Sequence, residues 1–392
     1  LPYTNMSGDP SQEYFSDGLT EHIINGLCKV SNLFVIARNS SFAYKNKAVS
    51  VKQIAKELGF RYILEGSVQR AGDRVRIATQ LIDAITEYHL WSESYDRNIY
   101  DIFALQDEIT DILIKAMEVK LIFGEQARHW RSVGTESIKA YDKLMRARDN
   151  YYRHNKQDNV QARQLAKDAI AIDEEYAFAY VVLGFILLSD LQYGSSINPL
   201  LDRIEIKECA VKALNLNPSF DLAHALLGYL FWIEKDYYRA VENMKKAVAL
   251  NPNGADAHTH LGFSLTRLGK SVEAIEMIKR AIRLNPIPPP DYYSHLGNAY
   301  RMNGQHLEAI EACKKAIFRS PEYRSPYITM AACYSSVRRD QQAHEIVSKI
   351  LKRSPKFSID GVSISAGFQQ KDDLDDLVQA LREAGTPEHS PE

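Results

Sequence analysis

Cysteine is scarce in this chain, with four residues in 392, far apart and without a CxxC pair. That spacing fits reduced, buried thiols better than a disulfide framework or a structural zinc site. Charge of one sign is also missing, since the formal net charge is −2 and neither side of residue 124 is strongly basic. A phosphate backbone needs a basic protein surface, so we expect no nucleic-acid partner.

Long apolar runs are absent too. The most apolar stretch, residues 178–188, has eleven residues, which is too short to cross a bilayer. Because no signal peptide is evident, we expect a cytoplasmic chain without direct membrane insertion; the alternative is the periplasmic part of a membrane-anchored protein. The chain starts with "LPYTNMSGD" and not with methionine, which indicates a fragment or a processed product.

Catalytic signatures are missing as well. A phosphate loop at "GKS", residues 269–271, would need a preceding strand and a glycine where Ser264 stands, so we interpret it as a turn. In "HTH", His258 and His260 point to different helix faces, and His258 occupies the same repeat slot as His224. These histidines are predicted to pack in the core and not to bind metal. We expect no catalytic residue, no metal and no cofactor, so this chain is not predicted to be an enzyme.

The tripeptide "LNP" is present three times, at a spacing of 34 residues, at 216–218, 250–252 and 284–286. Each 34-residue unit reads as two amphipathic helices separated by a short polar turn. Small residues recur where two helices would approach each other closely, and a proline follows the second helix and ends it. In the unit 221–254 these small residues are Gly228, Ala240 and Ala247.

This pattern resembles the tetratricopeptide repeat. Four consecutive units match it over residues 221–357, and two looser units, 137–175 and 177–220, precede them. About ten extra residues near 191–202 are interpreted as a loop that lengthens the turn inside one unit. The sequence therefore predicts a linker, a repeat region, a capping helix and a disordered tail, at residues 125–136, 137–371, 372–385 and 386–392.

Residues 1–124 lack this period and mix helical and strand patterns. We expect an α+β domain, a small mixed sheet with flanking helices, followed by an all-α solenoid. The predicted helices are 15–30, 50–59 and 102–121, and the predicted strands are 33–38, 62–70, 74–83 and 87–96, the last two forming a hairpin across "AIT".

The stretches "LPYTNMSGDPSQEYFSDGLTEHI", "FVIARNSSFAYK", "ELGFRYILEGSVQRAGDRVRIATQLID" and "HLWSESYDR" resemble the TolB amino-terminal-type domain. In bacteria such a domain commonly lies between an effector domain and tetratricopeptide repeats, and the effector is often a class III adenylate/guanylate cyclase. In other proteins the effector is a winged-helix DNA-binding domain followed by a membrane span. The apolar run that leads into "LP" in this family is missing here, so we expect a shortened first strand.

The resemblance implies the non-catalytic regulatory and interaction region of a bacterial signalling protein, a class III nucleotide cyclase. The alternative is the sensory ectodomain of a membrane-anchored winged-helix transcription regulator. A third option is an enzyme whose site lies within residues 1–124. The sequence leaves open whether the chain forms a homodimer.

In stacked repeats of this type the first helix of each unit lines a concave groove. The corresponding slots predict a groove that binds a protein segment, with an apolar end and a cationic end, formed by Tyr229, Trp232, Ile233, Phe263, Arg267, Asn298 and Arg301. It resembles carboxylate-clamp grooves only in part, because the slot asparagine is present once and the clamp lysines are missing. The alternative is that residues 1–124, or the stretch after Pro355, cover this groove within the chain.

Overall fold

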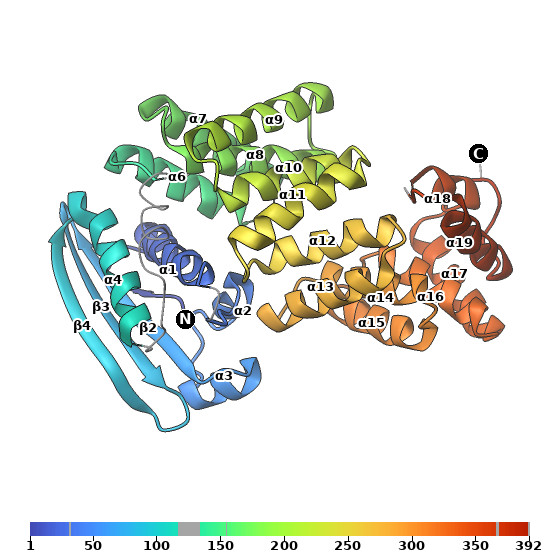
Figure 1. The fold of residues 1–392 in the computed structure, drawn as a ribbon, viewed down its shortest axis with the longest axis horizontal. Coiled ribbons are helices and arrows are strands. Elements are labelled where there is room, and N and C mark those ends of the chain that lie inside the picture. The colour runs from blue at the N-terminus through green and yellow to red at the C-terminus, as the bar shows by residue number, and fades with distance from the viewer. Residues whose placement is uncertain (31–32, 117–133, 154, 366–367, 391–392) are drawn as a thin grey trace. The chain divides into compact units, whose positions relative to one another are not determined.

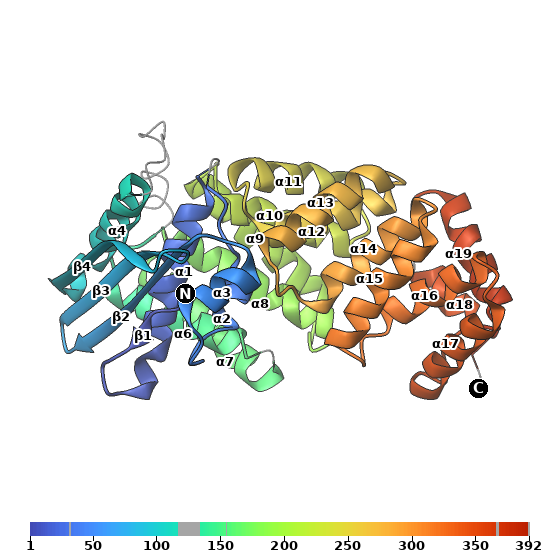
Figure 2. The ribbon, with the colours of Figure 1, turned by 90° about the horizontal axis from the view of Figure 1, so that it is seen from below.

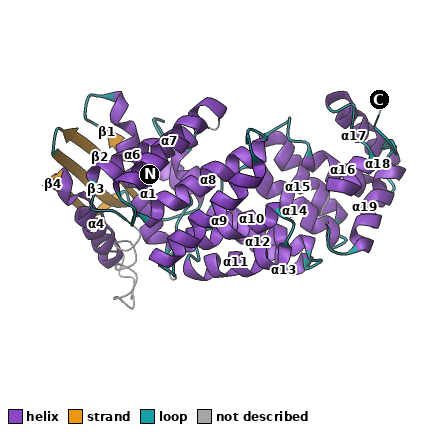
Figure 3. Ribbon diagram, turned by 90° about the horizontal axis from the view of Figure 1, so that it is seen from above, coloured by secondary structure: helices purple, strands orange, loops and turns teal. Residues whose placement is uncertain are grey.

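The computed structural model describes residues 1–392 except 31–32, 117–133, 154, 366–367 and 391–392 (Figure 1). The chain divides into two compact units. The first unit holds residues 1–230, 246–254 and 284–286, and the second holds 231–245, 255–283 and 287–392. Strands lie in the first unit only, as far as the described residues go, and the second is helical (Figure 3). The predicted α+β part followed by an all-α repeat region is thereby confirmed.

A four-stranded mixed sheet forms the start of the first unit, with strand order β1-β2-β3-β4. The short β1 pairs in parallel with β2, and the other two pairings are antiparallel. The predicted hairpin is confirmed, with Ala84–Glu87 between its strands. The strands are β1 (Thr4–Asn5), β2 (Tyr62–Ala71), β3 (Arg74–Asp83) and β4 (Tyr88–Asn98).

Helices cover one face of this sheet. Helices α1 (Glu13–Cys28) and α4 (Ile102–Ala116) contact each other on that face (Figures 1 and 2). On β3, Val75, Ile77 and Leu81 are buried, and Arg74 and Arg76, which flank Val75, are exposed, as expected when successive side chains alternate across a strand. The predicted helix 102–121 and the linker 125–136 extend into residues that are not described.

A third helix, α3 (Val51–Leu58), lies where the sequence predicts it, and its two ends show why. The Ser50 hydroxyl accepts a hydrogen bond from the backbone N–H of Gln53, which caps the helix N-terminus. Gly59 ends the helix with φ of 74°, a left-handed conformation that favours glycine. A polar residue before the helix and a glycine after it are therefore sufficient signals at this position.

The predicted strand at 33–38 is wrong. Residues 33–37 form an irregular segment outside the sheet, and the short helix α2 (Arg38–Phe42) follows. Their backbone groups bond to turns of the repeats instead of a neighbouring strand. The N–H of Ala37 donates to the carbonyl of Leu284 at 2.7 Å, and the carbonyl of Leu33 accepts from Asn253 Nδ2 at 2.9 Å. Buried backbone polar groups need partners, and here the repeat turns provide them.

The first repeats belong to the first unit. They form two helical hairpins, α6 with α7 and α8 with α9, and the beginning of α10 follows. Gly184 allows close packing, because a Cβ there would lie 2.3 Å from a side-chain carbon of Leu226. The helices are α6 (Ile138–Tyr151), α7 (Lys156–Ile172), α8 (Ala177–Tyr193), α9 (Pro199–Leu216) and α10 (Asp221–Ile233).

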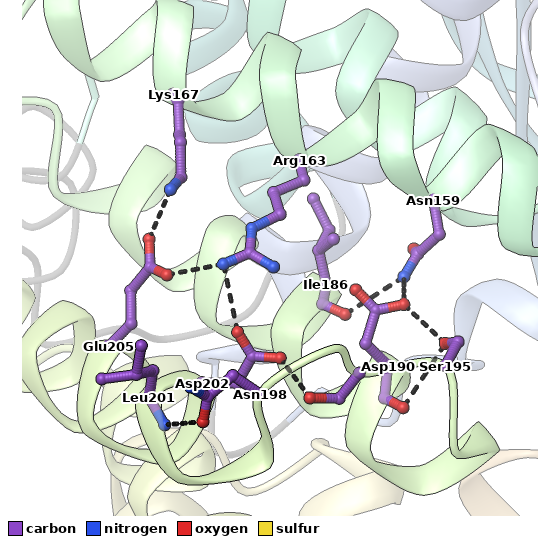
Figure 4. A network of polar contacts seen from close by, with 11 residues as sticks. Asn159, Arg163, Lys167, Ile186, Asp190, Ser195, Asn198, Leu201, Asp202 and Glu205 are labelled. Carbon is purple, nitrogen blue, oxygen red and sulfur yellow. Dashed lines mark hydrogen bonds and ion pairs between the residues drawn. The ribbon is translucent and has the colours of Figure 1, made fainter.

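The insertion at 191–202 is not a loop throughout, which corrects the prediction. Only residues 194–198 lie outside helices, so the extra residues lengthen α8 and α9. A polar network supports this extension (Figure 4). The Asp190 carboxylate accepts from Asn159 Nδ2 at 2.8 Å and from the Ser195 hydroxyl at 2.7 Å. The Asp202 carboxylate accepts from Ser196 at 2.6 Å. The inserted residues are therefore part of the packed structure.

We expect Asp190→Ala to lower the free energy of unfolding by about 1–3 kcal/mol, because it leaves the buried Asn159 amide with one hydrogen bond fewer. Urea titration followed by circular dichroism measures the change. Glu208→Ala is the matched control, since Glu208 is exposed on α9. Equal effects of the two substitutions would contradict a structural role for the network. Deleting residues 191–202 is expected to be more damaging than either substitution.

Hairpins of similar length continue through the second unit. At Gly262 and Gly297 the missing side chain lets the paired helices approach, because a Cβ would lie 2.5 Å from an Ile278 carbon or 2.7 Å from Cys313 Sγ. The "GKS" stretch is a turn, as predicted, with Gly269 at φ of 75°. The helices are α11 (Tyr237–Leu250), α12 (Ala255–Arg267), α13 (Ser271–Leu284), α14 (Pro290–Met302), α15 (His306–Arg319), α16 (Ser325–Ser336) and α17 (Asp340–Arg353).

Two further helices end the second unit, α18 (Ile359–Ser365) and α19 (Lys371–Glu383). Leu377 and Leu381 of α19 are buried, and α19 contacts α16 and α18. The described part of the predicted disordered tail, residues 386–390, forms no helix or strand but contacts the helices before it. The N–H of Ile359 donates to the carbonyl of Pro387 at 2.9 Å, and other tail residues bond to α18 and α19.

None of the helices in the described parts of the chain is long and apolar enough to cross a membrane.

Candidate functional site

The predicted groove residues lie on the first helices of successive repeats, α10, α12 and α14. Six of the seven belong to the second unit. The seventh, Tyr229, belongs to the first unit, where its ring packs edge-on against Phe185 with centroids 5.7 Å apart. The part of the predicted groove that lies in the second unit is called the inner groove below. It is formed by Trp232, Ile233, Phe263, Arg267, Asn298 and Arg301 together with His260 and His295.

Aromatic side chains form one wall of the inner groove. The Trp232 ring packs edge-on against Phe263 at 5.4 Å and against His260 at 6.0 Å. The Phe263 ring lies 4.3 Å from the ring of His295, and His295 is buried. Aromatic pairs at these separations are favourable beyond the apolar area they bury. The wall is therefore well packed before any partner binds.

Sequence reasoning did not assign His260 or His295 to the groove. Of the two histidines in "HTH", His258 is 3% exposed and packs in the core as predicted, whereas the ring of His260 lies against Trp232. His224, in the slot that matches His258, lies with Nε2 3.3 Å from the carbonyl of Pro218. A sequence signal for their place in the groove was available. His260 and His295 occupy the same position in consecutive repeats, each directly after a position that is expected to face the groove. Within the described residues, no cluster of three or more metal-ligating side chains is present.

Two arginines form the cationic end. The Arg301 side chain is buried, and its polar contacts are with Asn298 Oδ1, at 3.4 Å from Nε, and with the Met302 sulfur, at 3.0 Å from Nη2. Arg267 lies with its guanidinium 4.8 Å from the Phe263 ring centroid, and its Nε has no hydrogen-bond partner. No ion pair joins either arginine to a carboxylate among the described residues. Buried cations are usually paired, so this end of the groove has unused capacity for an anion.

The surroundings shift the pKa values of both arginines downwards. Burial, followed by the neighbouring Arg301 charge, lowers the pKa of Arg267 to about 10. Burial also lowers the pKa of Arg301, while the carboxylates of Asp373 and Asp376 act in the opposite direction. Both guanidinium groups remain charged at neutral pH, so the groove presents two positive charges side by side.

The chain itself covers this cationic end. The Phe368 ring centroid lies 4.3 Å from the Arg267 guanidinium carbon and 5.7 Å from that of Arg301. The next residue, Gln369, donates its backbone N–H to the carbonyl of Arg267 at 3.2 Å, and its side-chain amide donates to the carbonyl of Lys235 at 3.4 Å. Of the two alternatives left open by the sequence, the structure shows a contribution from the stretch after Pro355.

A second polar cluster lies in the first unit. Glu21 of α1 forms ion pairs with Arg148 of α6 and, at 3.1 Å, with Arg38 of α2. The Tyr152 hydroxyl donates to Glu21 at 2.9 Å, and the Arg38 guanidinium stacks 3.8 Å above the Tyr152 ring. The adjoining cavity measures only about 20 Å³. Because its charges are satisfied within the chain, we interpret this cluster as structural.

Comparisons with known proteins identify the repeats. Family models described as tetratricopeptide repeat match residues 261–324 and 223–253. The protein named putative adenylate cyclase 3 of Rhizobium meliloti (strain 1021) is 50% identical over 190 residues. That match covers 48% of this chain and 32% of the relative, so the chain spans about a third of its length.

Solved tetratricopeptide-repeat structures are similar at low identity. A thermophilic TPR protein of Thermus thermophilus, TTC0263, is 18% identical, with 50% of this chain and 98% of that chain covered and a TM-score of 0.40. YrrB, titled a TPR protein with an unusual peptide-binding site, is 20% identical, with coverage of 48% and 92% and a TM-score of 0.38.

Proposed function

We propose that this chain, a small α+β domain followed by tetratricopeptide repeats, is the non-catalytic regulatory and protein-interaction region of a bacterial signalling protein. The signalling protein is a class III adenylate or guanylate cyclase. The observation behind this proposal is the 50% identity over 190 residues to a protein named putative adenylate cyclase 3. The resemblance of residues 1–124 to the TolB amino-terminal-type domain supports it, because that domain commonly lies between a cyclase and such repeats. On this proposal the chain acts in the cytoplasm.

The inner groove supports the interaction role. It combines a packed aromatic wall with two arginines that lack carboxylate partners in the described chain, which suits a protein segment with apolar and anionic groups. The residues proposed for binding are Trp232, Ile233, Phe263, Arg267, Asn298 and Arg301, with Tyr229 as a separate contact in the first unit.

Contacts within the first unit support joint action of the α+β domain and the repeats. Lys29 of the α+β domain forms a buried ion pair with Asp221 of α10 at 3.5 Å. Asn253 Nδ2 donates to the carbonyl of Cys28 at 2.9 Å, and the Ser40 hydroxyl donates to Asn285 Oδ1 at 2.6 Å. A movement of these repeat turns would therefore directly displace the residues after α1 that bond to them.

We expect the purified chain to convert neither ATP nor GTP to a cyclic nucleotide in the presence of magnesium, because no metal-ligating cluster lies within the described residues. The full gene product that contains the chain is expected to have this activity, and mass spectrometry of the products measures both. Turnover by the purified chain itself would contradict its regulatory role.

A gene product without cyclase activity would overturn the cyclase assignment. If that gene product instead has a winged helix and an apolar span ahead of Leu1, the chain is the sensory ectodomain of a transcription regulator. Trp232→Ala combined with Arg301→Gln in the active gene product tests whether the groove regulates it. Unchanged cyclic-nucleotide production under all effector conditions would exclude a regulatory role of the groove.

A further inference from the structure

The two arginines at the cationic end of the inner groove have no carboxylate partner among the described residues. The segment that begins at Phe368, called the cover below, lies against them. Arg301 is 7% exposed, and its hydrogen-bond partners among the described residues are an amide oxygen and a thioether sulfur; Arg267 Nε lacks a hydrogen-bond partner there. A guanidinium forms its strongest contacts as paired hydrogen bonds to a carboxylate. The two arginines of the groove could therefore bind a carboxylate, and the segment that now covers them does not place one within ion-pair distance.

Within the described part of the cover, Phe368 is the side chain that contacts the two arginines. Phe368 is half-buried, with its ring close to both guanidinium groups, while Gln369 and Gln370 after it are exposed. Among the described residues, Gln369 holds the segment through its backbone hydrogen bond to Arg267 and a long side-chain contact to Lys235. The contact of Phe368 with the arginines is a cation–π interaction, which is weaker than a buried charge-assisted pair. Such a cover is replaceable.

Acidic residues follow the aromatic one. Asp373 and Asp376 at the start of α19 are near enough to Arg301 to raise its pKa, but neither comes within ion-pair distance. Gly269 approaches the same segment, since a Cβ there would lie 2.9 Å from the Gln370 side-chain nitrogen and 3.7 Å from Asp373. The covering segment therefore has the order of groups that fits the groove, an aromatic ring and then carboxylates, without forming the pair.

We infer that residues 368–376 are a built-in competitor for the inner groove, and that the ligand they imitate is a protein segment with an aromatic side chain followed within a few residues by a carboxylate. The inference rests on the proposed protein-binding role of the groove and deepens it. In the bound state the partner's ring replaces Phe368 between Arg267 and Arg301, and its carboxylate closes the pair with Arg301. The competitor keeps the groove shut against segments that offer only one of the two groups.

The test uses the intact chain and a fluorescein-labelled synthetic peptide with the sequence of residues 368–378, FQQKDDLDDLV, followed by fluorescence anisotropy. Phe368→Ala combined with Asp373→Asn weakens the internal competitor. We expect this variant to bind the peptide at least about tenfold more tightly than the unchanged chain, as when the groove is open in no more than about a tenth of the unchanged molecules.

Matched controls identify the contacts. Phe318→Ala removes an exposed phenylalanine of α15 in the same unit and should leave peptide affinity unchanged. A peptide with alanine in place of its phenylalanine, or with asparagine in place of its aspartates, should lose about tenfold or more in affinity for the opened variant. Arg301→Gln in the opened variant should cause a similar loss. Circular dichroism checks that each variant keeps its helicity.

If the opened variant loses helicity, Phe368→Met with Asp373→Asn, which keeps an apolar side chain, takes its place. Equal affinity of the opened and unchanged chains would overturn the competitor, and equal affinity for the peptide and its alanine or asparagine versions would overturn the ligand class. Absence of peptide binding to every variant would overturn both. Failure of the proposed function is separate, because it is measured as cyclic-nucleotide production by the gene product.

Discussion

Replacing Glu21 by alanine is expected to lower the free energy of unfolding of the first unit by about 3–5 kcal/mol, because removal of one partner leaves a buried charge uncompensated. Glu21 and Arg148 are 8% and 7% exposed, and Arg38 also pairs with the same carboxylate. Without Glu21 two guanidinium groups lie together, and the Tyr152 hydroxyl loses its acceptor. Urea unfolding followed by circular dichroism measures the loss.

Glu13→Ala provides the comparison on the same helix. Glu13 pairs with Lys45 at 2.8 Å, but its side chain is 38% exposed, and exposed pairs contribute about 0–1 kcal/mol. The two substitutions remove the same carboxylate from α1 and differ in burial and in partners. If Glu21→Ala is as mild as Glu13→Ala, the buried cluster does not stabilise the contact of α1 with α2 and α6.

Acidification is expected to destabilise the second unit through the histidines of the inner groove. Burial lowers the pKa of His260 to about 3, and burial together with the nearby His260 and Arg267 lowers the pKa of His295 well below its usual value. Both titrate near 6.5 when the chain is unfolded. Their neutral forms therefore stabilise the fold above pH 6.5, and this contribution is lost as the pH falls from about 6.5 towards 3. For His260 the loss is on the order of 1 kcal/mol per pH unit over that window, and His295 acts in the same direction.

The substitution His295→Asn isolates the effect, because asparagine does not titrate. We expect a shallower decline of the urea midpoint between pH 6.5 and 4.5 than in the unchanged chain, and His344→Asn, at an exposed histidine, is measured beside it as the control substitution. Asp291 acts in the opposite direction, since burial raises its pKa to about 6 and its protonation favours the folded state. Identical slopes for the unchanged chain and His295→Asn would contradict the assignment.

The regular parts of the fold follow from local signals in the sequence. Helices α12 to α17 lie where the 34-residue period places them, and the glycines at 262 and 297 allow the close approach that the small-residue slots indicate. The hairpin of β3 and β4 follows from alternation of apolar and polar residues across a short turn. Each of these signals acts within one supersecondary unit.

The corrected elements depend on partners far away in the sequence. The apolar stretch at 33–38 has the composition of a strand, but its backbone bonds to Asn253 and Leu284. The extra residues at 191–202 continue two helices because Asp190 and Asp202 find partners on α7 and in the intervening loop. No local sequence pattern indicates such long-range contacts. The sequence therefore predicted the commoner structures, a strand at 33–38 and a loop at 191–202.

The inner groove also combines residues that the sequence predicts with one that it does not. Positions within the 34-residue repeat predict that Trp232, Phe263, Arg267 and Arg301 lie on the first helices of successive units, because the repeat is periodic. They do not predict Phe368, which reaches Arg267 from about a hundred residues further along the chain. An occupant from outside the repeat has no slot, so only the folded structure identifies it.

Repeat arrays are commonly treated as modules that can be added or removed, and the contacts of Asn253 and Asn285 set a limit to that freedom here. These residues follow two consecutive repeats, and one short stretch between Cys28 and Ser40 binds both. A 34-residue module inserted between residues 254 and 255 would move Asn285 one repeat further away from Asn253, so the same stretch could not keep both contacts. Growth or loss of modules can therefore be accommodated beyond Pro286, whereas the spacing of the preceding modules is locked to the length of that stretch.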